Sequence, residues 1–460
     1  MIIYIFITVN IIILLIMLYF NFIHKKLLFQ PYILKIKSLI SQFHSFDSKP
    51  IVKNEGHVFG LPIFNNTNKL NLKEFNNIIH IDYVNQYIEV EGSTYIYQIL
   101  DELIKYNWII QVPPDMYHLT ISGLVSGIGG GSSSFKYGFI HENILDMDVL
   151  TGKGEILHCS KQNNSDLFYA IPNSLGTLGY ILKLKIKIRK ATSYVRVNYI
   201  HFSDSEEYFN QLYKYSVDPN VDFVDGTIFS PTHLVLIIGY FQFNIPANSN
   251  IFNHTEIFWK NLMDKNLTLQ YFTLYDYIWR WDPDMYYTTM ETPAWTRSNF
   301  LRNFAPKCLL KSTFYRSIAN FINFQHEAPD CNDVFIPIKK ANNFFKWFSN
   351  NYSLYPIYIC PVKCNENFTL WKKGFYCDFG IGYGVNFTKN NRPENLDLIL
   401  EQQIYDFKGK KLFYTPFYSS EKLFWKIIKC NSKHYYSLKK KYDPYSKFLS
   451  LYQKINKNKN

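Results

Sequence analysis

The first hydrophobic pattern in the chain is an uninterrupted apolar run. Residues 1–23 contain no charged side chain, and a helix of that length spans roughly 34 Å, enough for a bilayer core of about 30 Å. A cleaved signal peptide has a basic start, a shorter apolar run and a small-residue cleavage site, and these features are absent here. We therefore predict a single-pass membrane anchor over residues 1–23. The basic residues His24, Lys25 and Lys26 that follow predict that the body stays on the cytoplasmic side, at the endoplasmic reticulum in a eukaryotic cell.

Alternating and continuous apolar runs predict a series of strands in the body. Tyr180 to Ile188 alternates apolar residues with Lys183, Lys185 and Lys187, which is typical of a strand with one wet face. Other runs predict further strands, at 51–53, 78–82, 87–91, 145–149, 155–158, 223–229, 234–241, 333–336, 355–362 and 375–379, with one more near Leu412.

Apolar residues at helical spacing predict helices between these strands. They lie at 30–46, 94–106 and 339–349, with a short helix beginning at Ser165 and mostly helix after Leu396. The pattern as a whole predicts an α+β protein with an N-terminal transmembrane helix, in which a second region of the body begins near Ala191.

Composition narrows the function only in part. The 460 residues include 49 Lys and Arg against 37 Asp and Glu, a net charge of +12, but the basic residues are dispersed except near the ends. Because no zinc finger, RNA-recognition signature or basic amphipathic stripe is present, we expect no nucleic acid partner. Aromatic residues reach 18%, and most of this excess reflects a bias that also enriches Ile, Asn and Lys.

The seven cysteines indicate a reducing compartment. Their number is odd and no Cys-x-x-Cys occurs, so a disulfide framework is not expected. Cys360 and Cys364 lie four residues apart without a second pair of ligands. We therefore interpret them as packing residues and expect no metal site.

Residues 121–138, the glycine segment, carry the first chemical signal. Three serines follow a run of glycines, and six of the 20 glycines lie in this segment: Gly123, Gly127, Gly129, Gly130, Gly131, Gly138, with Ser132, Ser133 and Ser134. Successive backbone N–H groups at glycines, with serine hydroxyls, form an anion-binding concavity. The segment lacks the Gly-Lys-Ser/Thr end of a P-loop, and no helical pattern follows it. A flexible loop is the alternative, but apolar residues at its start favour a buried cradle for a phosphate-bearing cofactor.

Residues 165–181 carry the second signal. There Gly176-Thr-Leu-Gly179 forms a small turn just before the alternating strand. Such a turn admits a flat ring or a ribityl chain against its backbone. Glycine is also common at helix C-caps, so this turn is informative only together with the glycine segment.

The two segments together, about 40 residues apart, resemble the FAD-binding domain of the vanillyl-alcohol oxidase (PCMH-type) flavoproteins. Ser133–Gly138 with His141, and Ser165–Pro172 with Gly176–Gly179, are similar to the Δ24-sterol reductases (24-dehydrocholesterol reductase, Diminuto type). Later segments are also similar to that family, at 222–226, 333–337, 355–361 and 414–418. The resemblance covers roughly residues 30–455, and an N-terminal membrane anchor is a feature of that family as well.

The resemblance implies a two-lobed flavoprotein. Residues 30–190 would form the FAD-binding domain, 191–395 a cap that holds the substrate, and 396–460 a segment returning to the FAD lobe. In this family NADPH reduces FAD, which passes a hydride to a carbon–carbon double bond of a sterol side chain. The residues implied to contact FAD, by matching motif, are Gly123, Gly127, Gly129, Gly130, Gly131, Ser132, Ser133, Ser134, Tyr137, Gly138, Gly176, Thr177 and Gly179.

One part of the chain departs from the wider superfamily. Many members have a glycine-rich pyrophosphate loop after the first strand, often with a His that attaches the flavin covalently. Here residues 53–60 contain His57 but only two glycines. We therefore expect non-covalent FAD.

Reduction of a double bond also needs an acid. A hydride added to one alkene carbon requires a proton at the other, from a side chain within hydrogen-bond reach. The candidates are Asp333, Asp378, Tyr383, Tyr414 and Tyr418, each of which could instead be a packing or capping residue. The segment 279–282 (Trp-Arg-Trp-Asp) either lines an apolar substrate channel or packs in the core.

Two other functions remain open on the sequence. One is an FAD-linked oxidase or dehydrogenase of an alcohol or a sugar, including a lipid-linked sugar, because this fold hosts many chemistries. The other is a degenerate relative that keeps the scaffold as a membrane-bound binding protein. The sequence does not indicate an oligomeric state.

Overall fold

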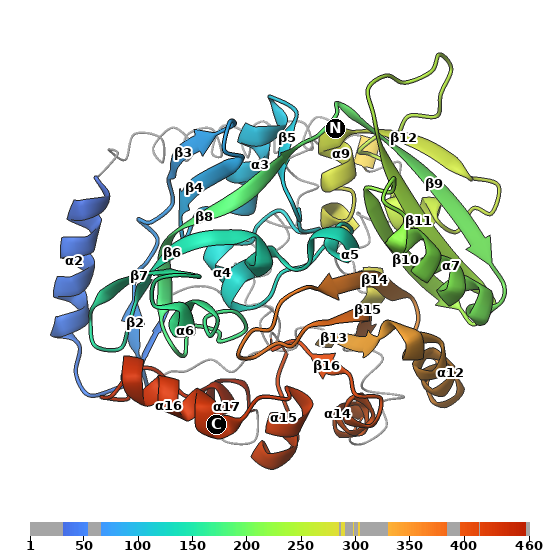
Figure 1. The fold of residues 1–460 in the computed structure, drawn as a ribbon. Helices are drawn as coiled ribbons and strands as arrows, with labels where there is room; N and C mark the ends of the chain where they lie inside the picture. Colours follow the sequence, from blue (N-terminus) through green and yellow to red (C-terminus); the bar gives the residue numbers. More distant parts are fainter. Residues whose placement is uncertain are drawn as a thin grey trace, which may run out of the picture. The chain divides into compact units, whose positions relative to one another are not determined.

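The computed structural model describes residues 31–53, 66–284, 287–289, 298, 302–303, 330–383, 396–413 and 415–456. The chain divides into two compact units, residues 1–45 and residues 46–460. The described element of the first unit is α2 (Tyr32–Ser45), and all the others belong to the second unit (Figure 1).

One antiparallel sheet is built around β8 (Tyr180–Lys190), as its alternating sequence predicts. Its strand order is β3 (Ile78–Asp82), β4 (Tyr87–Glu91), β8, β6 (Ile144–Leu150) and β7 (Ile156–Ser160), with β5 (Trp108–Ile110) also paired to β8. The apolar face of β8 packs in the main core with α3 (Ile96–Ile104), whose side chains at i, i+3, i+4 and i+7 are buried.

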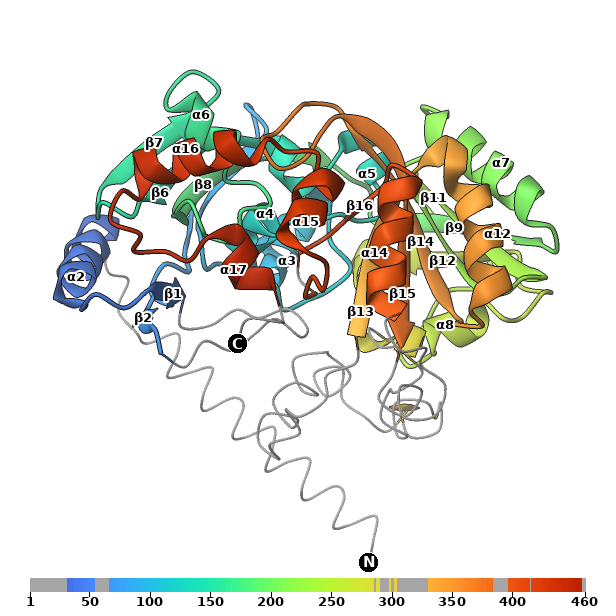
Figure 2. The same cartoon turned by 90° about the horizontal axis from the view of Figure 1, so that it is seen from below.

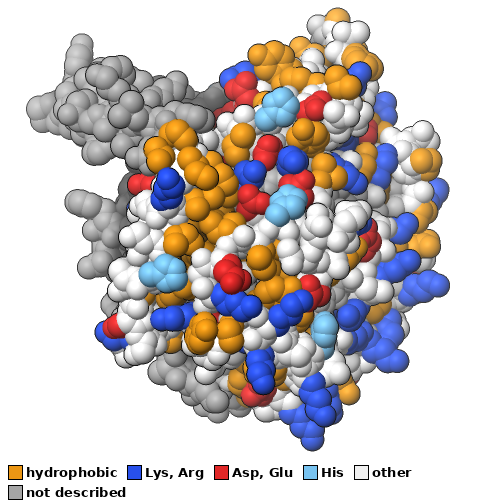
Figure 3. Space-filling model, turned by 60° about the vertical axis from the view of Figure 1, so that its left-hand side comes forward, with side chains coloured by type: hydrophobic (Ala, Val, Ile, Leu, Met, Phe, Trp, Pro, Cys, Tyr) orange, Lys and Arg blue, Asp and Glu red, His pale blue; other side chains and the backbone are white. Residues whose placement is uncertain are grey.

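The polar face of this sheet is balanced by ion pairs between neighbouring strands. Lys183 Nζ lies 2.9 Å from Glu89 Oε1, and Lys185 Nζ lies 3.2 Å from Asp146 Oδ2. On the face of the molecule drawn in Figure 3, Lys and Arg side chains are likewise interspersed with Asp and Glu. The net positive charge is therefore spread out on this face, which fits the dispersed pattern in the sequence.

A second antiparallel sheet, here called the cap sheet, has eight strands. Their order is β12 (Leu269–Thr273), β9 (Tyr194–Phe202), β11 (His233–Gln242), β10 (Phe223–Ser230), β14 (Ile357–Cys364), β15 (Gly374–Tyr383), β13 (Asp330–Pro337) and β16 (Lys410–Lys411). The helices α7 (Ser205–Val217), α12 (Ala341–Asn351) and α14 (Leu396–Asp406) lie on one side of it (Figure 2). Phe379 marks the covered face, since it contacts Phe209 of α7 and Phe344 of α12.

The last helices of the chain pack against the lobe of the first sheet. They are α15 (Glu421–Ile427), α16 (Ser432–Tyr442) and α17 (Leu451–Ile455), and Lys439 of α16 donates to Thr177 O over 2.9 Å (Figure 2). Tyr442 donates to Oδ1 of Asp166 in the short helix α6 (Ser165–Phe168), over 2.7 Å. The backbone N–H of Ile51 donates to Lys447 O over 2.7 Å, beside the small parallel pair of β1 (Ile51–Lys53) and β2 (Asn68–Leu70).

The predicted α+β class is confirmed, as are the predicted strands and helices of the described residues. The strands β2, β5, β9 and β12 were not predicted. Among the described residues, no helix combines the length and the apolar character needed to cross a membrane. The predicted anchor at 1–23 and the loop with His57 lie outside the described residues, and both stay predictions.

Candidate functional site

The glycine segment folds into two short helices joined by a tight turn. The sequence pattern did not predict these helices. The first is α4 (Ile121–Ser126), which begins because the Thr120 hydroxyl caps Gly123 N at 3.3 Å. It ends at Gly127, and Ile128 then adopts a left-handed backbone conformation with φ +62°. The second is α5 (Ser134–Tyr137). The segment is therefore buried and structured, which excludes the flexible-loop alternative.

Glycine is required at Gly131 by the approach of another chain segment. A Cβ there would lie 2.2 Å from Pro113 O, so the loop that follows β5 runs directly against the glycine segment. At Gly130 a Cβ would have only ordinary contacts, the nearest at 3.4 Å from Ser134 Oγ. The two neighbouring glycines thus have different structural roles.

The second glycine turn, residues 173–179, lies beside the glycine segment. Leu175 N donates to Ser126 O over 2.9 Å, which joins the turn to the end of α4. Asn173, Leu175 and Gly176 all have positive φ, at 64°, 52° and 76°. The structure therefore brings together the two motifs that carry the resemblance.

Two side chains of this turn have buried polar groups that form no hydrogen bond with any described residue. Asn173 and Ser174 are fully buried, yet the Asn173 amide and the Ser174 hydroxyl have no hydrogen-bond partner among the described residues. An unpaired buried amide or hydroxyl costs free energy, so these groups suit a polar ligand seated against the turn. This donor and acceptor set fits FAD, the cofactor that the resemblance implies.

Several of the other predicted cofactor residues have contacts within the protein. Ser133 Oγ donates to Gln111 O over 2.9 Å, and Ser134 Oγ accepts from Gly131 N over 3.1 Å. The Thr177 hydroxyl donates to Ser174 O over 2.7 Å and accepts from Tyr435 OH over 2.9 Å. These hydroxyls therefore hold the backbone of the two turns in place.

The remaining predicted positions are also tightly packed. Gly138 has φ +74°, and a Cβ at Gly129 would lie 2.6 Å from the Leu124 side chain. A Cβ at Gly179 would lie 2.9 Å from Leu150 O. The Tyr137 ring lies under the Arg189 guanidinium, 4.8 Å from its centre. These contacts fix the shape of the glycine segment and of the second glycine turn.

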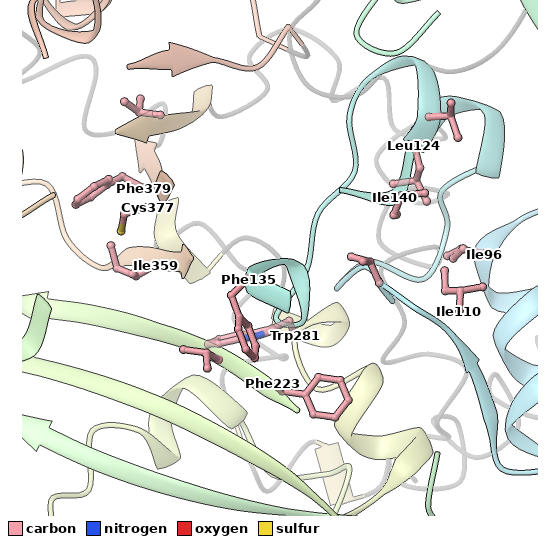
Figure 4. Close-up of a cluster of buried hydrophobic side chains, with 14 of the residues drawn as sticks. Ile96, Ile110, Leu124, Phe135, Ile140, Phe223, Trp281, Ile359, Cys377 and Phe379 are labelled. Carbon is pink, nitrogen blue, oxygen red and sulfur yellow. The ribbon is translucent and has the colours of Figure 1, made fainter. Parts of the chain in front are cut away.

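One face of the cap sheet is directed toward the glycine segment. Cys360 Sγ lies 3.3 Å from Gly131 O, and Val224 N donates to Ser132 O over 2.7 Å. Figure 4 shows apolar side chains of this region, with Leu124 and Phe135 from the glycine segment and Phe223 from a cap strand.

The same face carries carboxyl groups. Residues directly opposite each other on neighbouring strands share a face, and the register pairs Asp378 with Cys360 and Asp333 with Gly380. Asp333 and Asp378 therefore lie on the face that contacts the glycine segment. Tyr358, also opposite Gly380, lies on this face too.

A third carboxyl group reaches this face from the first lobe. Tyr358 OH donates to Oδ2 of Asp115, over 2.9 Å. Asp115 follows Pro113 and Pro114, in the loop that runs against Gly131. We call Asp115, Asp333 and Asp378 the carboxyl cluster.

The carboxyl cluster holds protons more tightly than ordinary aspartates do. Burial raises the pKa of Asp115 to about 6, with the Arg280 charge opposing the rise and the Asp225 charge adding to it. Burial and the charge of Asp115 raise the pKa of Asp333 to about 7. Burial and the charges of Asp333 and Asp115 raise the pKa of Asp378 well above its usual range. Near neutral pH the cluster thus keeps at least part of its protons.

The nearest buried cation is already paired. An Arg280 nitrogen donates to Asp225 Oδ2 over 2.5 Å, and Trp281 Nε1 donates to the same oxygen over 2.9 Å. All four residues at 279–282 are buried, so this segment packs in the core rather than on an open surface. The positive charge of Arg280 in this segment is paired with Asp225 on the cap strand β10.

The structure separates the predicted acid candidates. Tyr414 and the side chain of Tyr383 lie outside the described residues. Tyr418 N donates to Glu401 Oε1 over 3.1 Å, and Lys411 contacts the same oxygen. In the strand register Lys411 is opposite Val334, whose side chain is on the other face of β13 from Asp333. Tyr418 therefore lies away from the carboxyl cluster. Of the candidates whose side chains are described, Asp333 and Asp378 therefore lie in the carboxyl cluster.

The chain is similar to known flavin-dependent proteins. A family profile described as an FAD binding domain matches residues 36–160, which includes the glycine segment. Delta(24)-sterol reductase of Mus musculus is 25% identical over 399 residues, covering 82% of this chain and 76% of the mouse protein. The enzyme of the same name from Arabidopsis thaliana is 25% identical over 436 residues, covering 85% and 76%. The predicted resemblance is confirmed.

These matches also confirm the predicted class of enzyme, an FAD-dependent oxidoreductase. A shorter match reaches another flavoprotein. Cytokinin dehydrogenase 3 of Arabidopsis thaliana is 35% identical over 145 residues, which cover 31% of this chain and 27% of the plant protein. The match to the sterol reductases extends across both lobes, whereas this one is local.

Proposed function

We propose that this protein is a membrane-anchored, FAD-dependent reductase that uses NAD(P)H to reduce a carbon–carbon double bond of a sterol-like lipid. The observation that carries the proposal is the protonatable carboxyl cluster on the face that meets the glycine segment, because alkene reduction needs a proton donor next to the hydride donor. The similarity to Delta(24)-sterol reductases over most of the chain supports a sterol side chain as substrate.

The two glycine turns would hold FAD. Their backbone N–H groups, the Asn173 amide and the Ser174 hydroxyl are the groups that would bind it. Bound FAD would supply a hydride to one carbon of the double bond. Close packing of the cap strands and of the loop at Gly131 would exclude water from this side of the site.

Asp333 is proposed as the acid that completes the reduction. Its carboxyl proton would pass to the second alkene carbon, leaving Asp333 as a carboxylate that regains a proton from solvent. Asp333 is half-buried, so its carboxyl keeps access to its surroundings, whereas Asp378 is more deeply buried. A pKa of about 7 suits an acid that must donate and be reloaded near neutral pH.

Isotope labelling tests this function. The purified protein, loaded with FAD, is given NADPH and a sterol with a side-chain double bond in deuterated water. We expect a product that gains two hydrogens, with one deuterium from solvent at a single carbon. Turnover of an alcohol or a sugar with no alkene reduction would instead establish the oxidase alternative. Failure to bind FAD would leave the non-catalytic binding protein.

A further inference from the structure

The hydrogen bond between Tyr358 and Asp115 is one of several contacts between the cap sheet and the first lobe. It joins residues 243 positions apart, from β14 of the cap sheet and from the loop that runs against Gly131. The backbone contact of Val224 with Ser132 and the contact of Cys360 with Gly131 already join the same surfaces. Placing a carboxyl group here, beside two others, is electrostatically unfavourable and therefore calls for a different explanation.

We propose that Asp115, held by Tyr358, is a positioning residue whose negative charge keeps Asp333 protonated until the proton is delivered to the substrate. This inference rests on the proposed function, in which Asp333 is the acid. Asp115 itself does not deliver the proton. It acts through the charge that it places near Asp333, and Tyr358 fixes that charge by hydrogen bonding to one of its oxygens.

The charged and titratable groups around Asp333 favour this division of roles. On β15 it faces Asp378, and on β14 the neutral groups Tyr358 and Cys360. On β10 the carboxylate of Asp225 is neutralised by Arg280, at 2.5 Å.

On β16, Lys410 lies opposite Phe335, on the same face as Asp333. Its ammonium group is directed elsewhere, toward Ile428 O at 3.2 Å and the Trp371 ring at 5.0 Å. Among these described neighbours, therefore, the only cations point away from Asp333 or are already paired. The like charge of Asp115 then acts on Asp333 without compensation.

The order of titration follows from the same geometry. Arg280 and the Tyr358 hydroxyl favour the Asp115 carboxylate and so lower its pKa, whereas the pKa of Asp333 is only raised, by burial and by the charge of Asp115. Asp115 therefore loses its proton before Asp333 does. A proton donor must be protonated to act, so activity should fall as the pH rises through about 7.

The test measures how this fall moves in three variants. Asp115→Asn keeps the shape and removes the charge, so we expect the basic limb of the pH–rate profile to move about 1 pH unit lower. Tyr358→Phe should move it less in the same direction, since Asp115 then spends more time neutral. Asp115→Glu, which keeps the charge, should restore the wild-type position, and the exposed Asp406→Asn should have no effect.

A second measurement needs no turnover. Infrared difference spectra of the intact protein follow the carboxylic C=O stretch of Asp333 across pH, with Asp333→Asn used to assign it. Unchanged titration of Asp333 in Asp115→Asn would overturn the inference, while thermal unfolding shows whether the variant is folded. If the titration shifts but no sterol is reduced, the inference on Asp115 stands and the proposed function fails.

Discussion

At the scale of single residues, a few side chains of the two glycine turns have polar groups that hold the backbone, and a few others have polar groups that the described fold does not use. The Ser133, Ser134 and Thr177 hydroxyls hold backbone groups, whereas Ser174 and Asn173 have buried polar atoms without a described partner. Unpaired buried groups are costly in a protein that has no ligand for them. This contrast separates residues that shape the site from residues that would bind within it.

Asp333→Asn should stop proton delivery without preventing hydride uptake by the enzyme. We expect turnover to fall by roughly 10²- to 10⁴-fold, the range for loss of a general acid, because an amide does not donate the required proton. Rapid-mixing absorbance should show anaerobic reduction of the flavin by NADPH at an unchanged rate. Equal slowing of both steps, or no slowing of turnover, would remove Asp333 from its proposed role.

Ser174→Ala should weaken cofactor binding without harming the fold. The hydroxyl has no described partner, so its loss should leave the unfolding free energy of the cofactor-free protein unchanged or slightly higher. The Kd for FAD, measured by fluorescence quenching, should rise roughly 2- to 10-fold.

Ser216→Ala is the matched control for that variant. Its hydroxyl donates to Leu212 O over 2.6 Å inside α7, so its loss should lower stability and leave the Kd for FAD unchanged. If Ser174→Ala bound FAD like the wild type, Ser174 would not belong to the cofactor site.

The local chemistry of the site was only partly predictable from the sequence. The glycines and the Gly176–Gly179 turn were visible because they cluster in a short stretch. Asp115 and Tyr358 were not, since 243 residues separate them and neither lies in a distinctive local pattern. Asn173 lies in the second glycine motif, but only the burial of its amide without a described partner indicates that it binds a ligand.

At the scale of secondary-structure elements, the strands were predicted where one face is wet and the other buried. β8 alternates Ile and Leu with Lys along most of its length, so its period is unmistakable. β9 was missed because its outward positions include apolar and aromatic residues such as Tyr194 and Ile200, which obscure the alternation. The short helix α4 was missed because Gly123 interrupts its six residues, although Thr120 caps it.

Gly131 and Gly130 provide a matched pair that tests the packing of the glycine segment. Gly131→Ala would place a Cβ 2.2 Å from Pro113 O, so the loop must shift, and we expect a lower Tm and a lower content of bound flavin. Gly130→Ala makes only ordinary contacts and should leave the Tm unchanged. Thermal unfolding and the flavin absorbance of the purified variants give both results, and equal Tm values for the two variants would contradict this packing.

At the scale of the whole second unit, the proposed function requires the two sheets to meet at one place. The glycine segment and the Asp115 loop come from the first lobe, and the other two carboxyl groups come from the cap sheet. In the proposed function, each lobe alone would have half of the chemistry, a cradle for a cofactor or a source of protons. This is why the family resemblance along most of the chain is more informative than the match to the first lobe alone.

The most direct test of the central claim is the visible spectrum of the FAD-loaded protein without oxygen. We predict that NADPH bleaches the flavin band and that a sterol with a side-chain double bond restores it, while the saturated sterol does not. A flavin band that NADPH leaves unchanged but an alcohol bleaches, or one that the unsaturated sterol fails to restore, would contradict the account.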